Sequence, residues 1–376
     1  MRMLFLIFQD LKESHGISNK IIYQYEAFRD WGMDIDLCSL NLDETGRRNY
    51  VVRDRILGSI GRGPLSRLRF FADYRGIYDF IREQEIKVIY IRYTHFANPF
   101  FLSFLKKLKK RGVRIFVEIP TYPYDGELKV STFLSRMKKR VEHICRDRFH
   151  NYVDRIVTFS DDEIIFGTPT IRISNGVDFS KIPLKRSAGE KGVFNLLGVA
   201  SMAAWHGFDR IIDGMYAYYR KGGKEQIHFY IVGGGSQEII DLYKRKTETY
   251  GLSAYVHLSG PASGKVLDEY FDKAHLAIGS IGGHRNNVFQ SKPLKNVEYA
   301  ARGIPFVYSI RNGDFDHQPY IKRISMDDSA VSMEELLAFY RSAAWSPAEI
   351  RKSVEPRLSW YHQMGIVLKE LPGILE

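Results

Sequence analysis

The sequence predicts an α/β protein with two doubly wound parallel sheets, one in each half of the chain. Short apolar runs alternate with longer amphipathic stretches over residues 1–178, which is the rhythm of strands and helices in such a sheet. The rhythm is lost over residues 179–192, where Lys, Gly and Pro replace the apolar periodicity, and it restarts at Val193. We therefore expect an N-terminal domain over residues 1–178, a linker, a C-terminal domain over 193–345 and a C-terminal helix over 346–376.

In the N-terminal half, the expected strands are short apolar runs, some of them continuous as in strands that are covered on both faces. They occupy residues 4–8, 34–40, 88–91, 114–118, 155–159 and 170–174. Helices are expected over residues 19–31, 65–84, 99–111 and 130–150, and residues 41–64 are expected to form a polar loop or short excursion. The first loop contains Gly16 without the G-x-G-x-x-G fingerprint, which argues against an NAD-dependent oxidoreductase.

The C-terminal half repeats this rhythm without repeating the sequence. Its expected strands occupy residues 193–199, 227–232, 256–259, 275–281 and 305–309, and its expected helices occupy 207–220, 237–250 and 265–273. The tail over residues 347–371 has the apolar spacing of an amphipathic helix. Glycines follow two of the strands, at 233–235 and at Gly260, where ordinary turn chemistry or a close approach of the backbone to a ligand explains them.

The composition limits the classes of partner. The chain has 376 residues, 44% of them hydrophobic and 26% charged, which is typical of a soluble globular protein with two domains. A formal net charge of +11 indicates an anionic partner: nucleic acid, a phosphate-bearing ligand or an anionic membrane surface. We expect no nucleic acid, because no recognition motif for it occurs. Cys38 and Cys145 form no C-x-x-C or Cys/His cluster, so neither a disulfide framework nor a zinc site is expected.

The same features predict a cytoplasmic protein. Two cysteines fit a reducing compartment, and the first apolar run is too short for a secretory signal. No stretch approaches the 18 uninterrupted apolar residues of a transmembrane helix. Basic amphipathic stretches near residues 100–111 and 133–148 are suited to a peripheral contact with the inner face of the plasma membrane. The solvated outer faces of ordinary helices explain each stretch at least as well.

Residues 281–307, IGGHRNNVFQSKPLKNVEYAARGIPFV, carry the strongest functional signal. Lys292, Lys295 and Glu298 stand three residues apart, so on a helix they would lie on one slowly drifting face. The N-terminus of such a helix also offers partial positive charge and free backbone N–H groups. Phosphates favour these groups, and a ribose diol favours the carboxylate. The stretch therefore predicts a site for a nucleoside diphosphate, with a solvated surface helix as the alternative.

The order of parts in this stretch is strand, Gly loop, His284-Arg285, basic helix start, Glu298 and Gly-x-Pro. That order resembles the donor site of GT-B glycosyltransferases, in particular the retaining group called family 4, to which many bacterial capsule and exopolysaccharide enzymes belong. Glu298 matches the second glutamate of their E-x7-E pattern, and Gln290 holds the position of the first. The sequence N-G-V-D at residues 175–178 is similar to the end of the N-terminal domain in that family.

The resemblance implies two Rossmann-like doubly wound domains that face a central cleft. It also implies transfer of a sugar from a UDP- or GDP-linked donor to a saccharide or lipid-linked saccharide, with retention of configuration, in surface polysaccharide synthesis. Beyond this co-substrate it implies no cofactor and no metal. The absence of a D-x-D motif in a suitable loop agrees with a metal-independent site, because Asp34-Ile35-Asp36 begins an expected strand.

Within the donor site, the resemblance assigns Lys295 to the diphosphate and Glu298 to the ribose hydroxyls. Lys292 and Arg285 are expected to reach the same phosphates, and His284 is expected to touch the sugar or a phosphate. The loop after residue 199 has Ser201 and His206-Gly207 where family 4 commonly has Arg and Lys-Gly, which removes two phosphate cations. The remaining expected donor-site residues are Trp205, His206, Gly234 and Gly260. Gly16 joins them because the loop after the first strand can bring it close to a ligand phosphate, with a simple turn as the alternative.

In the first domain, a Pro- and Tyr-rich loop over residues 118–127 is expected at the carboxyl end of a strand, where open α/β sheets bind ligands. Glu118 lies nearest to the place where family 4 often has a functional histidine, and we expect it to be catalytic together with Arg285 and Lys295. A plain surface turn is the alternative for this loop. The side chains expected to bind the acceptor are His95, Tyr122, Tyr124, Asp125 and Glu127.

Two further functions stay open at this point. A GT-B nucleotide-sugar epimerase would release UDP without an acceptor. An inactive GT-B-like binding subunit of a polysaccharide assembly complex is left open by Gln290, Ser201 and His206, which depart from the family pattern. Such a subunit would bind nucleotide weakly or not at all, whereas a glycosyltransferase must bind its donor.

Overall fold

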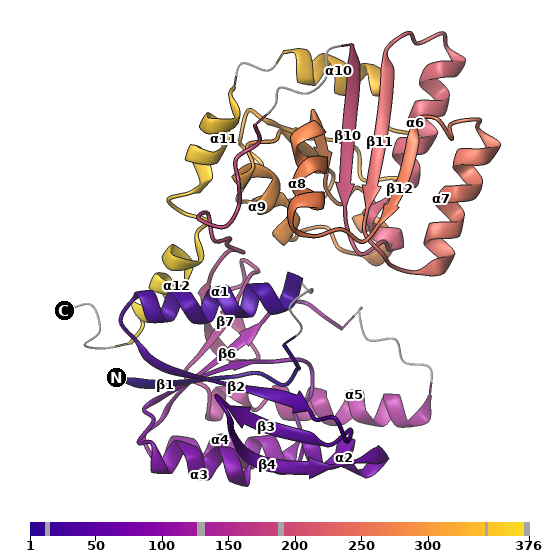
Figure 1. Ribbon diagram of the computed structural model, residues 1–376. Helices are drawn as coiled ribbons and strands as arrows, with labels where there is room; N and C mark the ends of the chain where they lie inside the picture. Colours follow the sequence, from indigo (N-terminus) through magenta and orange to yellow (C-terminus); the bar gives the residue numbers. More distant parts are fainter. Residues whose placement is uncertain (12–15, 126–131, 187–191, 343–344, 372–376) are drawn as a thin grey trace. The chain divides into compact units, whose positions relative to one another are not determined.

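The computed structural model of the protein describes residues 1–11, 16–125, 132–186, 192–342 and 345–371. The chain divides into two compact units (Figure 1). Unit 1 comprises Met1–Ser174 and Trp360–Glu376, and unit 2 comprises Asn175–Ser359. The described part of the expected linker belongs to unit 2, because Phe179 is buried in the hydrophobic core of that unit.

Unit 1 contains a sheet in which the described strands follow the order β4-β3-β2-β1-β5-β6-β7-β9-β8. The pairs from β2 through β1, β5, β6 and β7 to β9 are parallel, while β3, β4 and β8 pair antiparallel. The strands are β1 (Arg2–Leu6), β2 (Asp34–Leu42), β3 (Arg48–Val52), β4 (Arg55–Gly61), β5 (Val88–Arg92), β6 (Arg114–Ile119), β7 (Arg155–Thr158), β8 (Ile164–Ile165) and β9 (Thr168–Arg172).

Helices cover both faces of this sheet, which explains its continuous apolar strands. Met3 and Phe5 of β1 share one core with α1 and α12, and Leu4 and Leu6 share the opposite core with α3 and α4. Figure 1 shows α1 and α12 on one face, with α3, α4 and α5 on the other. The helices are α1 (Gly16–Asp30), α2 (Gly63–Phe70), α3 (Arg75–Glu83), α4 (Pro99–Lys110), α5 (Phe133–Arg146), the 3-10 turn η1 (Phe149–Asn151) and α12 (Trp360–Leu368).

Two expectations for the first half are wrong. Residues 41–64 contain the antiparallel pair β3 and β4, which the polar sequence conceals because only alternate residues such as Tyr50 and Val52 face the core. Residues 65–84 form two helices rather than one. The chain turns at Asp73, whose carboxylate accepts hydrogen bonds from the backbone and side chain of Arg75.

Unit 2 contains a fully parallel sheet, with its described strands in the order β12-β11-β10-β13-β14-β15. The strands are β10 (Val193–Val199), β11 (Gln226–Val232), β12 (Val256–Gly260), β13 (Leu276–Ile278), β14 (Phe306–Tyr308) and β15 (Ile321–Arg323). The helices are α6 (Asp209–Arg220), α7 (Gln237–Thr249), α8 (Gly264–Lys273), α9 (Leu294–Ala301), α10 (Met333–Arg341) and α11 (Pro347–Val354), with 3-10 turns η2 (Ala204–His206) and η3 (Gly283–Asn286). Leu196 and Leu197 of β10 enter opposite cores, so both faces of this sheet are also covered.

The structure corrects two details of the second half. The tail does not form one helix over residues 347–371, because α11 ends before Pro356 and α12 begins at Trp360. Lys292 does not lie on the same helix as Lys295 and Glu298, since α9 begins at Leu294 and Pro293 is its N-cap. Among the described helices, none combines the length and the apolar character that crossing a membrane requires.

Candidate functional site

The strand order of the sheet in unit 2 reverses between β10 and β13, which are neighbours in the sheet. From β10 the chain adds β11 and β12 on one side, and then returns to add β13, β14 and β15 on the other. The loops that follow β10 and β13 therefore leave the same edge of the sheet and diverge to opposite faces. Open α/β sheets bind ligands in the crevice formed at such a switch point.

These two loops are tied together at the switch point. The backbone N–H groups of Ile281 and Gly282 donate to the carbonyls of His206 and Trp205. Gly207 makes this approach sterically feasible: its φ is +67°, and a Cβ there would lie 2.8 Å from the nitrogen of Gly282. The sequence reading found each loop but not their contact.

Lys295 and His206 meet in the middle of this junction. The Nζ of Lys295, in the first turn of α9, lies 2.8 Å from Nδ1 of His206 in η2. Nε2 of His206 lies 3.1 Å from the carbonyl oxygen of Ser201, so Nε2 carries the proton and donates it there. Nδ1 is then the acceptor for the Lys295 ammonium, and the Ser280 hydroxyl lies 3.3 Å from the same atom.

Both groups have strongly lowered pKa values. Burial, reinforced by the charge of Lys295, lowers the pKa of His206 to about 2, so the imidazole is neutral. Loss of solvation lowers the pKa of Lys295 to about 7. Within the described residues, no carboxylate lies within ion-pair distance of Lys295, and its ammonium contacts the neutral imidazole of His206. An anion arriving at Nζ would supply the compensating charge that the protein does not.

Glu298 follows Lys295 by one turn of α9. Its Oε1 accepts hydrogen bonds from Nε and Nη2 of Arg302 at 3.3 and 3.2 Å, so among the described contacts Oε2 is the oxygen that remains for a ligand. Burial raises the pKa of Glu298, and Arg302 opposes this change. Lys292 precedes the helix, and its backbone carbonyl accepts from the side chain of Asn175. The structure thus brings Lys295 and Glu298 to one helix, with Lys292 just before it.

Arg285 and His284 are engaged by carboxylates. The two terminal nitrogens of Arg285 each lie 2.8 Å from an oxygen of Asp209, and its Nε lies 2.7 Å from Asp328. Nε2 of His284 also contacts Asp328, at 3.0 Å. In this structure Arg285 therefore fastens the loop after β13 to the start of α6. Its predicted contact with a phosphate requires that these pairs open, and it stays a prediction.

Other predicted donor-site residues lie on the same edge of unit 2. Trp205 is 44% exposed on η2, beside His206. Gly234 accepts a hydrogen bond from the backbone of Met202, which joins the loops after β10 and β11. Gly260, with φ of +68°, accepts from Gly233 and joins the loop after β12 to the same group. Gly16 is the first residue of α1 in unit 1, and its predicted approach to the donor stays untested.

The sequence reading missed three polar residues at this junction. Asp209 and Ser280 were not singled out, although they hold Arg285 and face His206. Asn296 lies between the two predicted ligands on α9 and is fully buried, with neither amide atom hydrogen-bonded within the described chain. No periodic signal marks such a residue, because its environment depends on strands that are distant in sequence.

In unit 1, Glu118 lies in a network of buried charged and polar groups. Its carboxylate accepts from Tyr90 and Gln24, both at 2.7 Å, and pairs with Arg92. Burial opposes ionisation of Glu118, but Arg92, Lys20 and the hydrogen bonds outweigh it and lower the pKa of the carboxyl. Glu118 is fully buried, so the structure gives it the position of a group that stabilises the domain. A catalytic role for it stays a prediction.

Three of the predicted acceptor residues come together in unit 1. The ring of His95 stacks on Tyr124 at 3.8 Å, with His95 at a φ of +57°. The hydroxyl of Tyr124 donates to Glu142, and Asp125 forms a two-pronged pair with Arg146 at 2.8 and 2.9 Å. Tyr122 packs edge-on against Phe166. Tyr124 is buried, which leaves its ring no free face for a sugar, and Glu127 lies outside the described residues.

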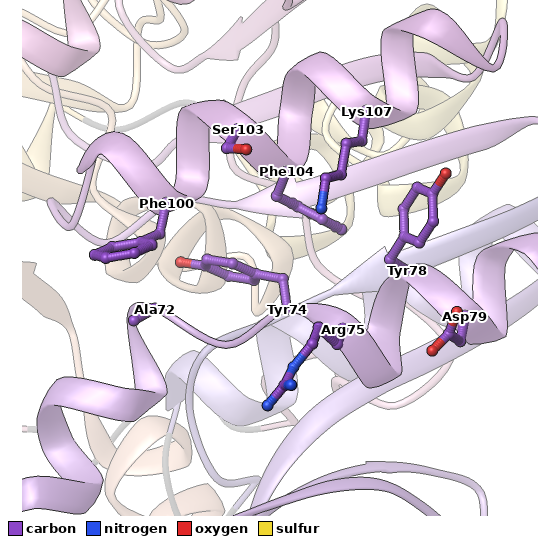
Figure 2. Close-up of a pocket in the computed structure, with 9 residues that line it drawn as sticks. All are labelled: Ala72, Tyr74, Arg75, Tyr78, Asp79, Phe100, Ser103, Phe104 and Lys107. Carbon is purple, nitrogen blue, oxygen red and sulfur yellow. The ribbon is translucent and has the colours of Figure 1, made fainter.

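A separate pocket of about 350 Å³ lies between α3 and α4, and Figure 2 shows its lining side chains. None of the predicted site residues lines it. Two of its charged groups are paired, Arg75 with Asp73 and Asp79 with Arg82, and the Nζ of Lys107 lies 5.8 Å from the centre of the Tyr78 ring. Across the described chain, no group of three or more His, Cys, Asp or Glu side chains is placed to hold a metal ion.

The fold has many solved counterparts. Sucrose-phosphate synthase from Thermosynechococcus elongatus matches at 14% identity and a TM-score of 0.66, over 99% of both chains. HepE from Anabaena in complex with UDP matches at 14% identity and 0.66, over 99% of this chain and all of HepE. The catalytic domain of starch synthase IV from Arabidopsis thaliana, bound to ADP and acarbose, matches at 12% identity and 0.64, over 98% of this chain and 97% of that domain.

No protein family profile matches the chain, and no curated protein sequence matches it. The structural matches span the full chain at identities that carry the fold alone. They confirm the predicted class: the protein has the GT-B fold, with two Rossmann-like α/β units.

The buried network around Glu118 generates a stability prediction. Replacing it (Glu118→Gln) keeps the side-chain shape but removes the charge that compensates Arg92, so chemical denaturation should show a loss of about 3–5 kcal/mol in unfolding free energy. The control Glu83→Gln breaks the exposed pair with Arg55 and should cost less than about 1 kcal/mol. Unfolding of Glu118→Gln at the wild-type denaturant concentration would contradict the structural role.

Proposed function

We propose that the protein is a glycosyltransferase that uses a nucleoside-diphosphate sugar as donor. The observation that carries this proposal is Lys295: a poorly solvated ammonium at the switch point of unit 2, held by a neutral imidazole and lacking a described carboxylate partner. Glu298 stands one helical turn further along α9. A diphosphate satisfies the first group and a ribose diol satisfies the second, and the spacing of three residues suits one nucleotide.

The chemistry follows from this geometry. In the transfer, the bond between the anomeric carbon and the diphosphate oxygen breaks, and the diphosphate leaves with the electron pair. The acceptor hydroxyl oxygen forms the new bond to that carbon, and its proton passes to the leaving diphosphate. Lys295 stabilises the negative charge that develops on the leaving group, which is the largest contribution that such a site makes to catalysis. Glu298 orients the nucleotide.

Several finer parts of the proposal rest on the sequence resemblance. We propose membership of family 4, transfer with retention, a UDP- or GDP-linked donor, no bound metal, and a saccharide or lipid-linked saccharide as acceptor. We further propose a role in surface polysaccharide synthesis in the cytoplasm, with a peripheral contact at the inner face of the plasma membrane. Solved proteins of the same fold carry UDP or ADP, which supports a nucleoside diphosphate as the ligand class.

Nucleotide binding tests the donor site directly. UDP, GDP, ADP, CMP and dTDP should be screened by thermal shift, because a ligand of the native state raises the unfolding midpoint. We expect UDP or GDP to bind. Lys295→Met should weaken binding by about 10- to 100-fold, the value of a hydrogen bond to a charged group, and Glu298→Gln should weaken it about tenfold.

The matched control is Lys244→Met, which removes an exposed lysine from α7 and lowers the net charge equally. It should bind nucleotide as the wild type does. A folded wild type that binds none of the five nucleotides would overturn the donor site and favour the inactive binding subunit. If Lys295→Met and Lys244→Met lost nucleotide affinity equally, the loss would be explained by the lower net charge and not by the donor site.

The pKa of Lys295 predicts a pH dependence of donor binding. Because this pKa is lowered to about 7, the amine is charged below pH 7 and becomes neutral as the pH rises through 7. A diphosphate binds the charged form of Lys295, so the affinity for the donor is highest at acidic pH. The affinity falls as the pH rises, by at most about 100-fold at two pH units above the pKa. Calorimetry with UDP-glucose from pH 6 to pH 9 measures this directly, since its diphosphate does not titrate there.

Lys295→Arg is the control for this titration, because a guanidinium stays charged across the whole range. Its affinity for UDP-glucose should be independent of pH, whatever its absolute value. A wild-type affinity that does not change between pH 6 and pH 9 would contradict the assigned role of Lys295. An equal decline in Lys295→Arg would attribute the effect to another group.

A further inference from the structure

The helix α5 (Phe133–Arg146) buries a polar face and exposes an apolar one, the reverse of an ordinary helix on a protein surface. Its buried residues include Glu142 and Arg146, whereas its large apolar side chains face solvent. We name the exposed set the α5 apolar face; its members are Phe133 (73% exposed), Leu134 (65%), Met137 (43%), Val141 (36%) and Ile144 (51%). At 100° per residue these five positions fall within an arc of about 100°, which is the width of the apolar stripe that an amphipathic helix normally buries.

The buried polar face explains why α5 keeps this orientation. Oε1 of Glu142 accepts hydrogen bonds from the hydroxyls of Tyr93 at 2.5 Å and Tyr124 at 2.6 Å, and Arg146 bridges Glu142 and Asp125. A rotation that buried the apolar face would break these bonds and would leave the charged groups exposed or without partners. The orientation is therefore fixed by unit 1 itself, and the apolar face is left for a partner.

The other basic helix of unit 1, α4, does not expose an apolar face. In α4 (Pro99–Lys110) the apolar residues Phe101, Phe104 and Leu105 are buried, and Phe100 is the exposed exception. Figure 1 shows α4 and α5 on the same side of the sheet. By sequence alone the two stretches suit a membrane contact equally well, and the structure separates them. Of the two, only α5 presents an apolar stripe to the outside.

The charges beside the α5 apolar face indicate which kind of partner binds there. The exposed cations Arg136 and Arg140 border the α5 apolar face on one side, and Lys138 borders it on the other. Glu142 is the single carboxylate in this helix and is buried. Helices with an apolar face and Lys or Arg along its borders bind at the interface of anionic bilayers.

We infer that α5 is a docking surface for an anionic lipid bilayer, in which the apolar face enters the acyl boundary and the bordering cations meet lipid phosphates. A second copy of the chain fits less well. The α5 apolar face consists of five side chains, whereas a stable dimer buries about 800 Å² of accessible surface per partner, which takes about 20–30 residues. Two copies would also bring their cations together. The inference deepens the peripheral-membrane part of the proposed function, but vesicle binding needs no nucleotide, so the two can fail separately.

Vesicle flotation of the full chain tests the inference. The probes are vesicles of phosphatidylcholine alone and vesicles of equal parts phosphatidylcholine and phosphatidylglycerol. We expect binding to the second kind only. Leu134→Ser with Met137→Ser should reduce the bound fraction by about tenfold or more, because two apolar anchors are lost. Both side chains are exposed, so the unfolding midpoint should not change.

Matched controls separate insertion from general attraction. Ile56→Ser with Ile164→Ser removes two exposed apolar side chains from other elements of unit 1 and should bind vesicles normally. Arg136→Gln with Arg140→Gln should weaken binding, while Lys244→Gln with Arg245→Gln, which lowers the net charge equally, should not.

Three results would overturn the inference. The first is absence of binding to the anionic vesicles. The second is binding that the two charge variants reduce equally and the α5 apolar substitutions leave unchanged, which would indicate non-specific adsorption. The third is concentration-dependent dimerisation in light scattering that Leu134→Ser with Met137→Ser abolishes, without vesicle binding, which would assign the face to a second copy.

Discussion

The contact between the Lys295 ammonium and the neutral imidazole of His206 is the interaction on which the candidate donor site depends. It joins η2, in the loop after β10, to the first turn of α9, the helix that follows β13, across the switch point of the sheet in unit 2. A lysine that has lost solvation without gaining a carboxylate is costly to keep charged, so its pKa falls to about 7. That cost is recovered when an anion binds, which is why an incomplete ion pair indicates a ligand site.

Unit 1 contains a buried lysine, Lys20, that does have a carboxylate close to it. Burial lowers the pKa of Lys20 to about 7 as well, but Glu118 lies close enough to oppose the change, and Arg92 shares the same carboxylate. Both cations of that network lie against the Glu118 carboxylate, which also accepts hydrogen bonds from Tyr90 and Gln24, so these groups stabilise one another within the domain. Arg285 resembles this case, because Asp209 and Asp328 satisfy its guanidinium. Residue type alone does not separate a ligand-binding cation from a structural one; the partners do.

The sequence predicted what local periodicity controls. The continuous apolar runs gave the central strands of both sheets, and the three-residue spacing placed Lys295 and Glu298 on one helix. It could not predict contacts that depend on strand order, such as His206 with Lys295 across 89 positions or the capture of Arg285 by Asp209. The antiparallel strands β3 and β4 were missed because polar residues alternate along them. The orientation of α5 was missed because helical periodicity does not say which face is buried.

In the proposed donor site, the Lys295 ammonium receives the diphosphate of the donor. A structure of the protein with UDP bound tests it most directly. We expect a phosphate oxygen within hydrogen-bond distance of Lys295 Nζ and the ribose hydroxyls on Glu298, with His206 still neutral beside them. UDP bound at another place, with Lys295 contacting His206 alone, would contradict it.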